Sequence, residues 1–300
     1  MNKWVKRTSI FLALVAVGIV GAGVVGNELG ARKMARKIVV DVPPVALVSD
    51  ASHIAQGRYL FSTRGCAECH GSNGAGKEVF HEGAMLVSSP NLTRGAHSAT
   101  IAYKPVDWVR TLRHGVKPDG SPVMIMPSED YNRLTDDDVA AIVSYVMQLS
   151  PVDGRAALVQ LPVPVRALYG FGAIRDAAEK IDHALAPSQP VDAAITPAYG
   201  AYVANSCIGC HGTTFSGGKI PGAPPTWPAS ANLTPGKGSV MARYGTPELF
   251  MAMLRSGHRP DGSAISKVMP FEALKNLDDV DADSIYAYLQ TVAPKDAGRR

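Results

Sequence analysis

The stretches Cys66-Ala67-Glu68-Cys69-His70 and Cys207-Ile208-Gly209-Cys210-His211 decide the fold of this 300-residue chain, and they contain all four of its cysteines. In a helical turn, side chains three residues apart share a face and the next residue lies beside them. Each stretch therefore presents two thiols and one imidazole together. The chain is 46% hydrophobic and 19% charged, so it has enough apolar residues to build cores and is not a disordered chain.

The Cys-x-x-Cys-His pattern is typical of covalent haem attachment, in which both thiols bond to the haem and the histidine faces the iron. A zinc site is one alternative, but zinc ligands usually come in sets of four, and these motifs lie 141 residues apart. A redox dithiol normally accompanies a βαβ pattern, which this sequence lacks, and structural disulfides are the third alternative. The sequence therefore predicts two covalently bound haem c groups, held by Cys66 and Cys69 and by Cys207 and Cys210.

The two motifs begin a long internal repeat. Asn91-Leu92-Thr93 and Asn232-Leu233-Thr234 each start 21 residues after the motif histidine, and the offset between the copies grows only from 141 to 143 residues. A duplicated domain of about 95 residues explains this pattern. Further matching segments are 112–115 with 254–257, 117–121 with 259–263, and 126–127 with 269–270.

Helical signals recur in both copies. Thr135 precedes three aspartates, and Thr246-Pro247-Glu248 combines a capping residue, a first-turn proline and an acid, as at many helix starts. Apolar residues follow Thr135 at helical spacing, and no stretch alternates long enough to demand a sheet. The sequence predicts an all-α fold of small helices and long loops, in which an internal prosthetic group completes each core.

Residues 52–149 and 195–292 each resemble a cytochrome c domain. The matching features are Gly-x-Tyr before Cys-x-x-Cys-His-Gly, Asn-Leu-Thr, Leu-Arg-x-Gly with Pro-Asp-Gly, and Met-Pro. The pair is similar to the membrane-associated cytochrome c subunits of bacterial dehydrogenases, such as alcohol and gluconate dehydrogenases. The resemblance implies two tandem class I cytochrome c domains, joined by a linker at 150–194 and followed by a tail at 293–300. Those subunits often carry three haem motifs, and this chain has two.

The resemblance also implies the ligands of each iron. In the family a methionine just before a proline supplies the sixth ligand, opposite the motif histidine, and Met126-Pro127 and Met269-Pro270 match that position. Methionine there raises the haem potential. Met124 and Met85 remain alternatives at the first haem, and His258 at the second. The predicted axial ligands are His70, Met126, His211 and Met269.

Several repeated polar residues have two interpretations. The Asn and Thr of both Asn-Leu-Thr segments either bond to haem propionates or hold a loop over the porphyrin. Arg113 and Arg255 are candidates to pair with propionates. The repeated tyrosines, Tyr59 with Tyr202 and Tyr145 with Tyr288, are expected to pack the first helix of each domain against the last.

The N-terminus favours a membrane anchor. Residues 10–25 form an uncharged apolar run preceded by Lys3, Lys6 and Arg7, and with its flanks the run approaches the roughly 20 residues that span a bilayer. A cleaved signal peptide is the alternative, with Val20-Gly21-Ala22 as a tolerable cleavage site. We expect residues 1–27 to be the anchor and 28–51 a tether. Since bacterial haem attachment is extracytoplasmic, the resemblance implies a single-pass inner-membrane protein with its haem domains in the periplasm.

Charge excludes one class of partner. The first 40 residues hold seven of the basic residues and one acid, which leaves 23 basic against 25 acidic residues in the rest of the chain. The folded part thus has no basic footprint for nucleic acid. The sequence predicts an electron carrier, and not an enzyme, that relays electrons between a dehydrogenase and a respiratory acceptor. A di-haem enzyme such as a peroxidase is the alternative, although it needs an open axial position that the paired Met-Pro loops argue against.

Overall fold

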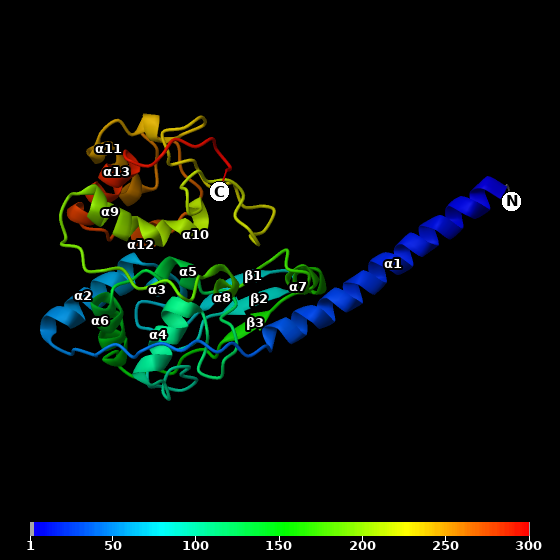
Figure 1. The fold of residues 1–300 in the computed structure, drawn as a ribbon, viewed down its shortest axis with the longest axis horizontal. Helices are drawn as coiled ribbons and strands as arrows, with labels where there is room; N and C mark the ends of the chain where they lie inside the picture. Colours follow the sequence, from blue (N-terminus) through cyan, green and yellow to red (C-terminus); the bar gives the residue numbers. More distant parts are fainter. Residues whose placement is uncertain (1–2, 300) are drawn as a thin grey trace.

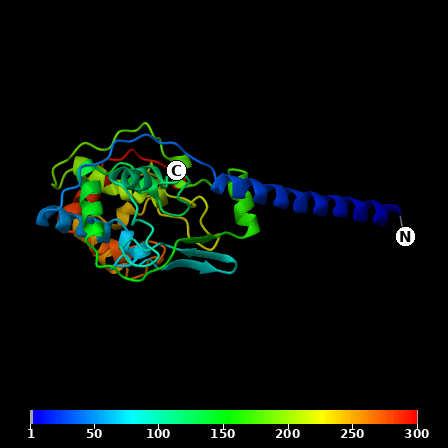
Figure 2. The same ribbon diagram turned by 90° about the horizontal axis from the view of Figure 1, so that it is seen from below.

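The computed structural model describes residues 3–299. A long N-terminal helix, α1 (Lys3–Met34), projects from a body made of two helical lobes (Figure 1, Figure 2). The lobes are the two copies of the sequence repeat, and we call them the first and the second domain. The predicted ranges 1–27 and 293–300 include residues 1, 2 and 300, which lie outside the described residues.

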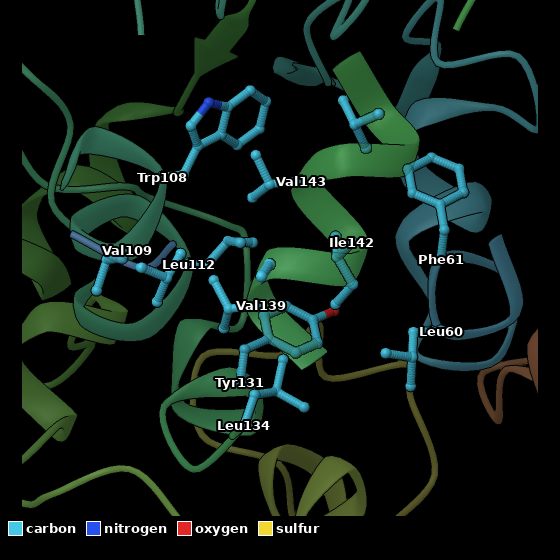
Figure 3. Close-up of a cluster of buried hydrophobic side chains, with 13 residues drawn as sticks. Leu60, Phe61, Trp108, Val109, Leu112, Tyr131, Leu134, Val139, Ile142 and Val143 are labelled. Carbon is cyan, nitrogen blue, oxygen red and sulfur yellow. The ribbon is translucent and has the colours of Figure 1, made fainter. Parts of the chain in front are cut away.

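The first domain is built on two crossing helices, α2 (Ala51–Thr63) and α6 (Asp136–Met147), with α4 (Pro105–His114) against α6. Figure 3 shows α6 between apolar side chains of α2 on one side and of α4 on the other. Burying these side chains supplies the main driving force for the fold. The core includes Leu60, Phe61, Trp108, Val109, Leu112, Tyr131, Leu134, Val139, Ile142 and Val143.

The second domain repeats this arrangement with α9 (Pro197–Ala204), α13 (Asp279–Leu289) and α11 (Pro247–Ser256). Helix starts occur where the sequence predicts them. The Thr246 hydroxyl accepts a hydrogen bond from the Leu249 N–H, and the Thr135 hydroxyl caps α6 in the same way. The mainly helical fold that the sequence predicts is therefore present in both copies.

A glycine allows the first and last helix of each domain to cross closely. A Cβ atom on Gly57 in α2 would lie 1.9 Å from the carbonyl oxygen of Ala141, and one on Gly200 in α9 would lie 1.8 Å from that of Ser284. Any side chain at either position would push the helices apart. Both glycines precede a tyrosine by two residues, so the repeat motif Gly-x-Tyr marks the crossing.

A small sheet is the part of the fold that the sequence did not predict. Strands β1 (Glu78–Glu82) and β2 (Met85–Ser88) form an antiparallel hairpin, and β3 (Leu158–Gln160) pairs with β2. The strands are three to five residues long, too short to show a clear alternation. The third comes from the linker, so no local pattern reveals the pairing. The mainly helical fold thus also contains one small three-stranded sheet, which the all-α expectation did not include.

The linker binds the base of the long helix. Within it, α7 (Val163–Gly170) packs across α1, where a Cβ atom on Gly30 would lie 2.2 Å from the Arg166 carbonyl oxygen. Beyond it, α8 (Ala177–Lys180) is capped by Asp176, whose buried carboxylate pairs with Arg36 at 2.7 Å. The linker therefore fixes the end of α1 against the first domain.

The segment predicted as a tether is packed along the first domain. The N–H of Ile38 donates to the Gly120 carbonyl oxygen at 2.8 Å. Val40 packs with Val116 of this domain, and Val45 joins the first-domain core. Residues 38–45 are thus held to the body and do not form a free stalk.

By length and composition, α1 is able to cross a membrane. Of its most apolar 18-residue stretch, 6% is buried within the protein. A signal sequence near an N-terminus meets the same criterion. The contact between α1 and α7 involves Gly26 and Gly30, which follow the apolar run of residues 10–25. The apolar run itself projects away from the body (Figure 1).

Candidate haem-binding sites

Both Cys-x-x-Cys-His segments fold as one short helical turn. The first is α3 (Cys66–His70), and the second is a 3₁₀ turn (Asn205–Cys207) continued by α10 (Ile208–His211). Each ends at a glycine with φ +78°, a conformation that favours glycine. The four thiols form no disulfide. The turn places the two thiols and the imidazole of each motif on neighbouring positions of one face.

One backbone hydrogen bond orients each motif histidine. The Nδ1 atom of His70 lies 3.0 Å from the Pro90 carbonyl oxygen, and that of His211 lies 2.9 Å from the Ala231 carbonyl oxygen. A carbonyl only accepts, so Nδ1 carries the hydrogen and Nε2 holds the lone pair that binds a metal. Burial lowers the pKa of His70, which favours the neutral, metal-binding form.

The environment of the cysteines disfavours a reactive dithiol. Burial raises the pKa of Cys66 to about 12 and that of Cys207 to about 12. Burial also raises the pKa of Cys69. A thiol of this kind stays protonated at neutral pH, whereas redox-active dithiols have lowered pKa values. Among the described residues, no group of three or more His, Cys, Asp and Glu side chains is arranged to hold a metal ion, as a zinc site would need.

The two Met-Pro loops have the same backbone conformation. Pro127 has φ −80° and ψ 68°, and Pro270 has φ −80° and ψ 66°. The carbonyl oxygen of Met126 accepts the N–H of Ser128, and that of Met269 accepts the N–H of Phe271, each at 2.9 Å. Met126 and Met269 pack against the cores of their own domains. The repeated loop thus presents one thioether to each core.

The alternative ligands lie in less suitable places. His258 is exposed, and its Nδ1 atom lies 2.8 Å from the Ser256 carbonyl oxygen. Met85 opens strand β2, where it pairs with Glu82. Met124 is half-buried beside the exposed Ile125 and does not share the repeated Met-Pro turn. Met126 therefore remains the better candidate in the first domain.

The Asn-Leu-Thr segments hold loops. The Asn91 amide donates to the carbonyl oxygens of Ala96 and Val152, both at 2.8 Å. The matching Asn232 amide donates to the carbonyl oxygens of Lys237 and Lys295. Both hydrogens of each amide are thereby used within the protein. The structure supports the loop-holding interpretation for the two asparagines.

The two arginines expected near propionates are paired within the protein. The Arg113 guanidinium donates to Asp136 at 2.7 Å and to the Leu134 carbonyl oxygen at 2.6 Å. Arg255 pairs with Asp279 at the matching place in the second domain. Both arginines link the helix that carries them, α4 or α11, to the start of the last helix of the domain. The propionate contact that the sequence suggested stays a prediction.

The domains contact each other reciprocally. The Tyr59 hydroxyl donates to the Asp281 carboxylate at 2.9 Å, and the Tyr202 hydroxyl donates to Asp138. Each pair joins the first helix of one domain to the last helix of the other, as in a pseudo-two-fold interface. The N–H groups of the matching helix caps donate to the same hydroxyls, namely Asp278 to Tyr59 and Thr135 to Tyr202.

This interface adds a role to one repeated pair. Tyr59 and Tyr202 pack against the cores of their own domains, as expected, and their hydroxyls also reach across to the other domain. In the other repeated pair, Tyr145 packs on Phe61 with ring centroids 5.5 Å apart, and Tyr288 lies beside Gly200 of α9. Sequence spacing cannot distinguish these roles, because the partner of Tyr59 lies 222 residues further along the chain.

Each haem motif also touches the other domain. The Glu68 carboxylate accepts the N–H of Ala273 in α12 (Phe271–Leu274) at 3.1 Å. Conversely, Asp130 in α5 (Ser128–Tyr131) accepts the N–H of Gly209 at 2.7 Å. Burial and the neighbouring Glu129 raise the pKa of Asp130 to about 8. Each Cys-x-x-Cys-His turn is thus held against the short helix that follows the opposite Met-Pro loop.

The donor set in each domain fits a covalent haem. Two thiols, one imidazole oriented through Nδ1 and one thioether are the ligand chemistry of c-type haem. The sequence model of the cytochrome c family matches residues 54–150 and 197–293. The chain therefore belongs to the cytochrome c family, with two domains whose paired cysteines imply two covalent haem c groups.

Similar proteins are subunits of larger enzymes. The fructose dehydrogenase cytochrome subunit of Gluconobacter japonicus is 26% identical over a 277-residue alignment that covers 81% of this chain and 53% of that protein. The quinone alcohol dehydrogenase cytochrome c subunit of Gluconobacter oxydans strain 621H is 32% identical over 131 residues, 41% of this chain and 27% of that protein. The cbb3-type cytochrome c oxidase subunit CcoP of Helicobacter pylori strain 52 is 27% identical over 128 residues, 42% of this chain and 38% of that protein.

The chain thus spans about half the length of the fructose dehydrogenase subunit and a smaller share of the other two. It is homologous to cytochrome c subunits of dehydrogenase complexes. That relation implies a role in electron transfer.

Proposed function

We propose that this protein is the di-haem electron-transfer subunit of a membrane-associated dehydrogenase and passes electrons to a respiratory acceptor. The observation that carries the proposal is the repeated donor set. Each domain has its own thiol pair, oriented histidine and Met-Pro loop, and the two sets differ little in local geometry. A pair of equivalent sites suits a relay better than a single reaction centre.

The residues of the chain have defined roles in this proposal. Cys66 and Cys69 attach the first haem through thioether bonds, and Cys207 and Cys210 attach the second. When bound, haem supplies one-electron chemistry between the ferrous and ferric states of its iron. The Pro90 and Ala231 carbonyls keep the motif histidines in the metal-binding tautomer. His70 with Met126, and His211 with Met269, would hold the two haem irons.

A histidine and a methionine in each domain would leave no open position on the iron, which favours electron transfer over substrate chemistry. A methionine ligand raises the potential of a haem and blocks the site from small molecules. The interface adds a structural reason, because both haem motifs contact the opposite domain. This contact keeps the two sites at a fixed separation.

The class of the electron donor is inferred from the similar proteins. Two of the proteins to which the chain is similar are named as dehydrogenase cytochrome subunits, so we propose a dehydrogenase as donor. We further propose that α1 is retained as a single-pass anchor in the bacterial inner membrane, with both domains on the periplasmic side. The length and apolar composition of α1 support the anchor, and the extracytoplasmic attachment of haem in bacteria supports the periplasmic side.

The test is purification of the full-length chain from native membranes by a C-terminal tag. We expect a dehydrogenase to co-purify and its substrate to reduce both haems in the visible spectrum. The reduced protein should bind carbon monoxide poorly. Ready carbon monoxide binding together with turnover of peroxide would contradict the proposal and favour a haem enzyme.

A further inference from the structure

A buried ion pair lies in the contact between the two domains. Nη2 of Arg64 is 2.9 Å from the Asp281 carboxylate, and the side chains are 4% and 1% exposed. Asp281 also accepts the hydroxyl of Tyr59 from the first domain at 2.9 Å and that of Tyr199 from its own domain at 2.7 Å. The carboxylate is thus fully desolvated and surrounded by donors from both domains.

This pair breaks the pseudo-symmetry of the interface. The repeat partner of Asp281 is Asp138, which accepts Tyr202 and, at 3.3 Å, the Gln56 amide. The residue at the position of Arg64, two before the first motif cysteine, is Asn205 in the second domain. Its neutral amide donates to the Asp130 carbonyl oxygen at 3.2 Å. Only one half of the interface therefore holds a cation at this position.

Arg64 lies close to both haem motifs. It precedes Cys66 by two residues in the chain. Its carbonyl oxygen accepts the hydroxyl of Tyr131 in α5 at 2.9 Å, and the neighbouring Asp130 of α5 accepts the N–H of Gly209 in the second motif at 2.7 Å. The buried arginine is thus next to the first attachment site and one short helix away from the second, although it belongs to the first domain.

We infer that the buried charges of Arg64 and Asp281, which lie in the interface between the domains, together set the reduction potentials of both haem sites. The inference rests on the proposed electron-transfer function. Reduction of a haem removes one positive charge from its site, so a nearby cation favours the reduced form and a nearby anion the oxidised form. In a dry interface such effects are far larger than at a hydrated surface. The two charges balance each other, and removal of one should move both potentials.

The experiment is potentiometric titration of the full-length holoprotein carrying Asp281→Asn. This change keeps the side-chain shape and leaves the Arg64 charge uncompensated. We expect both haems to become easier to reduce, with the ratio of reduced to oxidised haem at fixed potential rising about tenfold, or about 59 mV for a one-electron couple. In the double variant Arg64→Gln/Asp281→Asn, both charges are absent and the potentials should return toward the wild-type values.

Two controls separate charge from structure. Asp279→Asn makes the same charge change on the same helix, but Asp279 is 72% exposed and pairs with a half-exposed Arg255, so solvent screens its effect. Tyr199→Phe removes one hydrogen bond to Asp281 without changing charge. We expect both controls to keep near wild-type potentials.

The inference is overturned if Asp281→Asn shifts neither haem by more than Asp279→Asn does. Should Asp281→Asn fail to accumulate as holoprotein, Arg64→Gln makes the same test with the opposite sign, and potentials that do not fall would refute the pair. A wild-type protein without covalent haem would instead refute the proposed function, so the two failures are distinguishable.

Discussion

Single hydrogen bonds and single side chains set the chemistry of each site. The carbonyl oxygens of Pro90 and Ala231 hold the two motif histidines by Nδ1. Outer partners of this kind tune the basicity of a metal ligand as well as its orientation. The same carbonyl arises in both copies, 20 residues after the histidine in each case. The orientation of the histidine is therefore a property of the repeat and not of one domain.

The methionine ligands that we propose give the first prediction at this scale. Met126→His and Met269→His should each abolish the weak sulfur-to-iron absorption of one haem and lower its potential, because imidazole replaces a thioether that raises it. The measurement is a visible spectrum of the oxidised holoprotein with a potentiometric titration. Met124→Leu is the matched control and should leave both absorptions. If either histidine variant retains the full absorption, the ligand at that position is misassigned.

A histidine pair between the first domain and the linker gives a pH prediction. Nε2 of His183 donates to the Ala178 carbonyl oxygen, so its Nδ1 accepts from Nδ1 of His114 at 3.1 Å. Burial, followed by the charges of His183, Arg113 and Arg110, lowers the pKa of His114 to about 4. The unfolded chain binds the proton at a higher pH than the folded one, so this site loses stability as pH falls from about 6.5 to about 4.

We expect His114→Gln to reduce that loss. The free energy of unfolding should fall less between pH 7 and pH 4.5 in the variant than in the wild type, by on the order of 1 kcal/mol after allowance for solvent screening. Chemical denaturation of the holoprotein at both pH values measures this difference in the free energy of unfolding. Identical pH dependence in the two proteins would show that His114 does not titrate in this way.

Sequence reasoning finds residues whose partners are fixed by a local motif. The cysteines, histidines and Met-Pro pairs occur at short, repeated spacings. It missed the roles of Arg64 and Tyr59, because their partner Asp281 lies more than 200 residues away. From the sequence, an arginine near a cysteine motif is expected at the surface. In the structure, the second domain covers Arg64.

At the scale of elements, the crossing of the first and last helix defines each domain. Gly57→Ala in α2 and Gly200→Ala in α9 should each destabilise their own domain by about 1–3 kcal/mol through overpacking, although alanine favours helix formation. Chemical unfolding followed by circular dichroism measures the shift in midpoint.

Gly245→Ala is the control for these variants, because a Cβ atom there meets nothing within 4 Å. It should unfold like the wild type. Equal stability of the Gly57→Ala protein and this control would mean that the helices cross less closely than described.

Helix starts are the elements that sequence predicts best, since capping and first-turn acids act within four residues. Thr135 and Thr246 both cap as expected. Strands β1, β2 and β3 escaped prediction for the opposite reason. Their stability depends on Leu158–Gln160 arriving from the linker, which no local pattern encodes.

At the scale of the whole molecule, two contacts turn separate parts into one body. The pseudo-two-fold interface joins the domains through Tyr59, Tyr202 and the buried Arg64–Asp281 pair. The linker joins α1 to the first domain through Arg36 and Asp176. The repeat predicted two domains, but only the structure shows that they face each other through their haem motifs. This arrangement supports the electron relay that we propose, because it holds the two haem motifs in one body.

The central claim is that each domain holds one covalently bound haem, and the mass of the intact protein tests it most directly. The mature protein from a host with haem-attachment machinery is dissolved in denaturing acid and weighed by mass spectrometry. We predict the mass of the polypeptide plus two haem groups, shifted by one group in a Cys66→Ala/Cys69→Ala variant. A mass equal to the polypeptide alone, with the pigment released into the acid, would contradict the account.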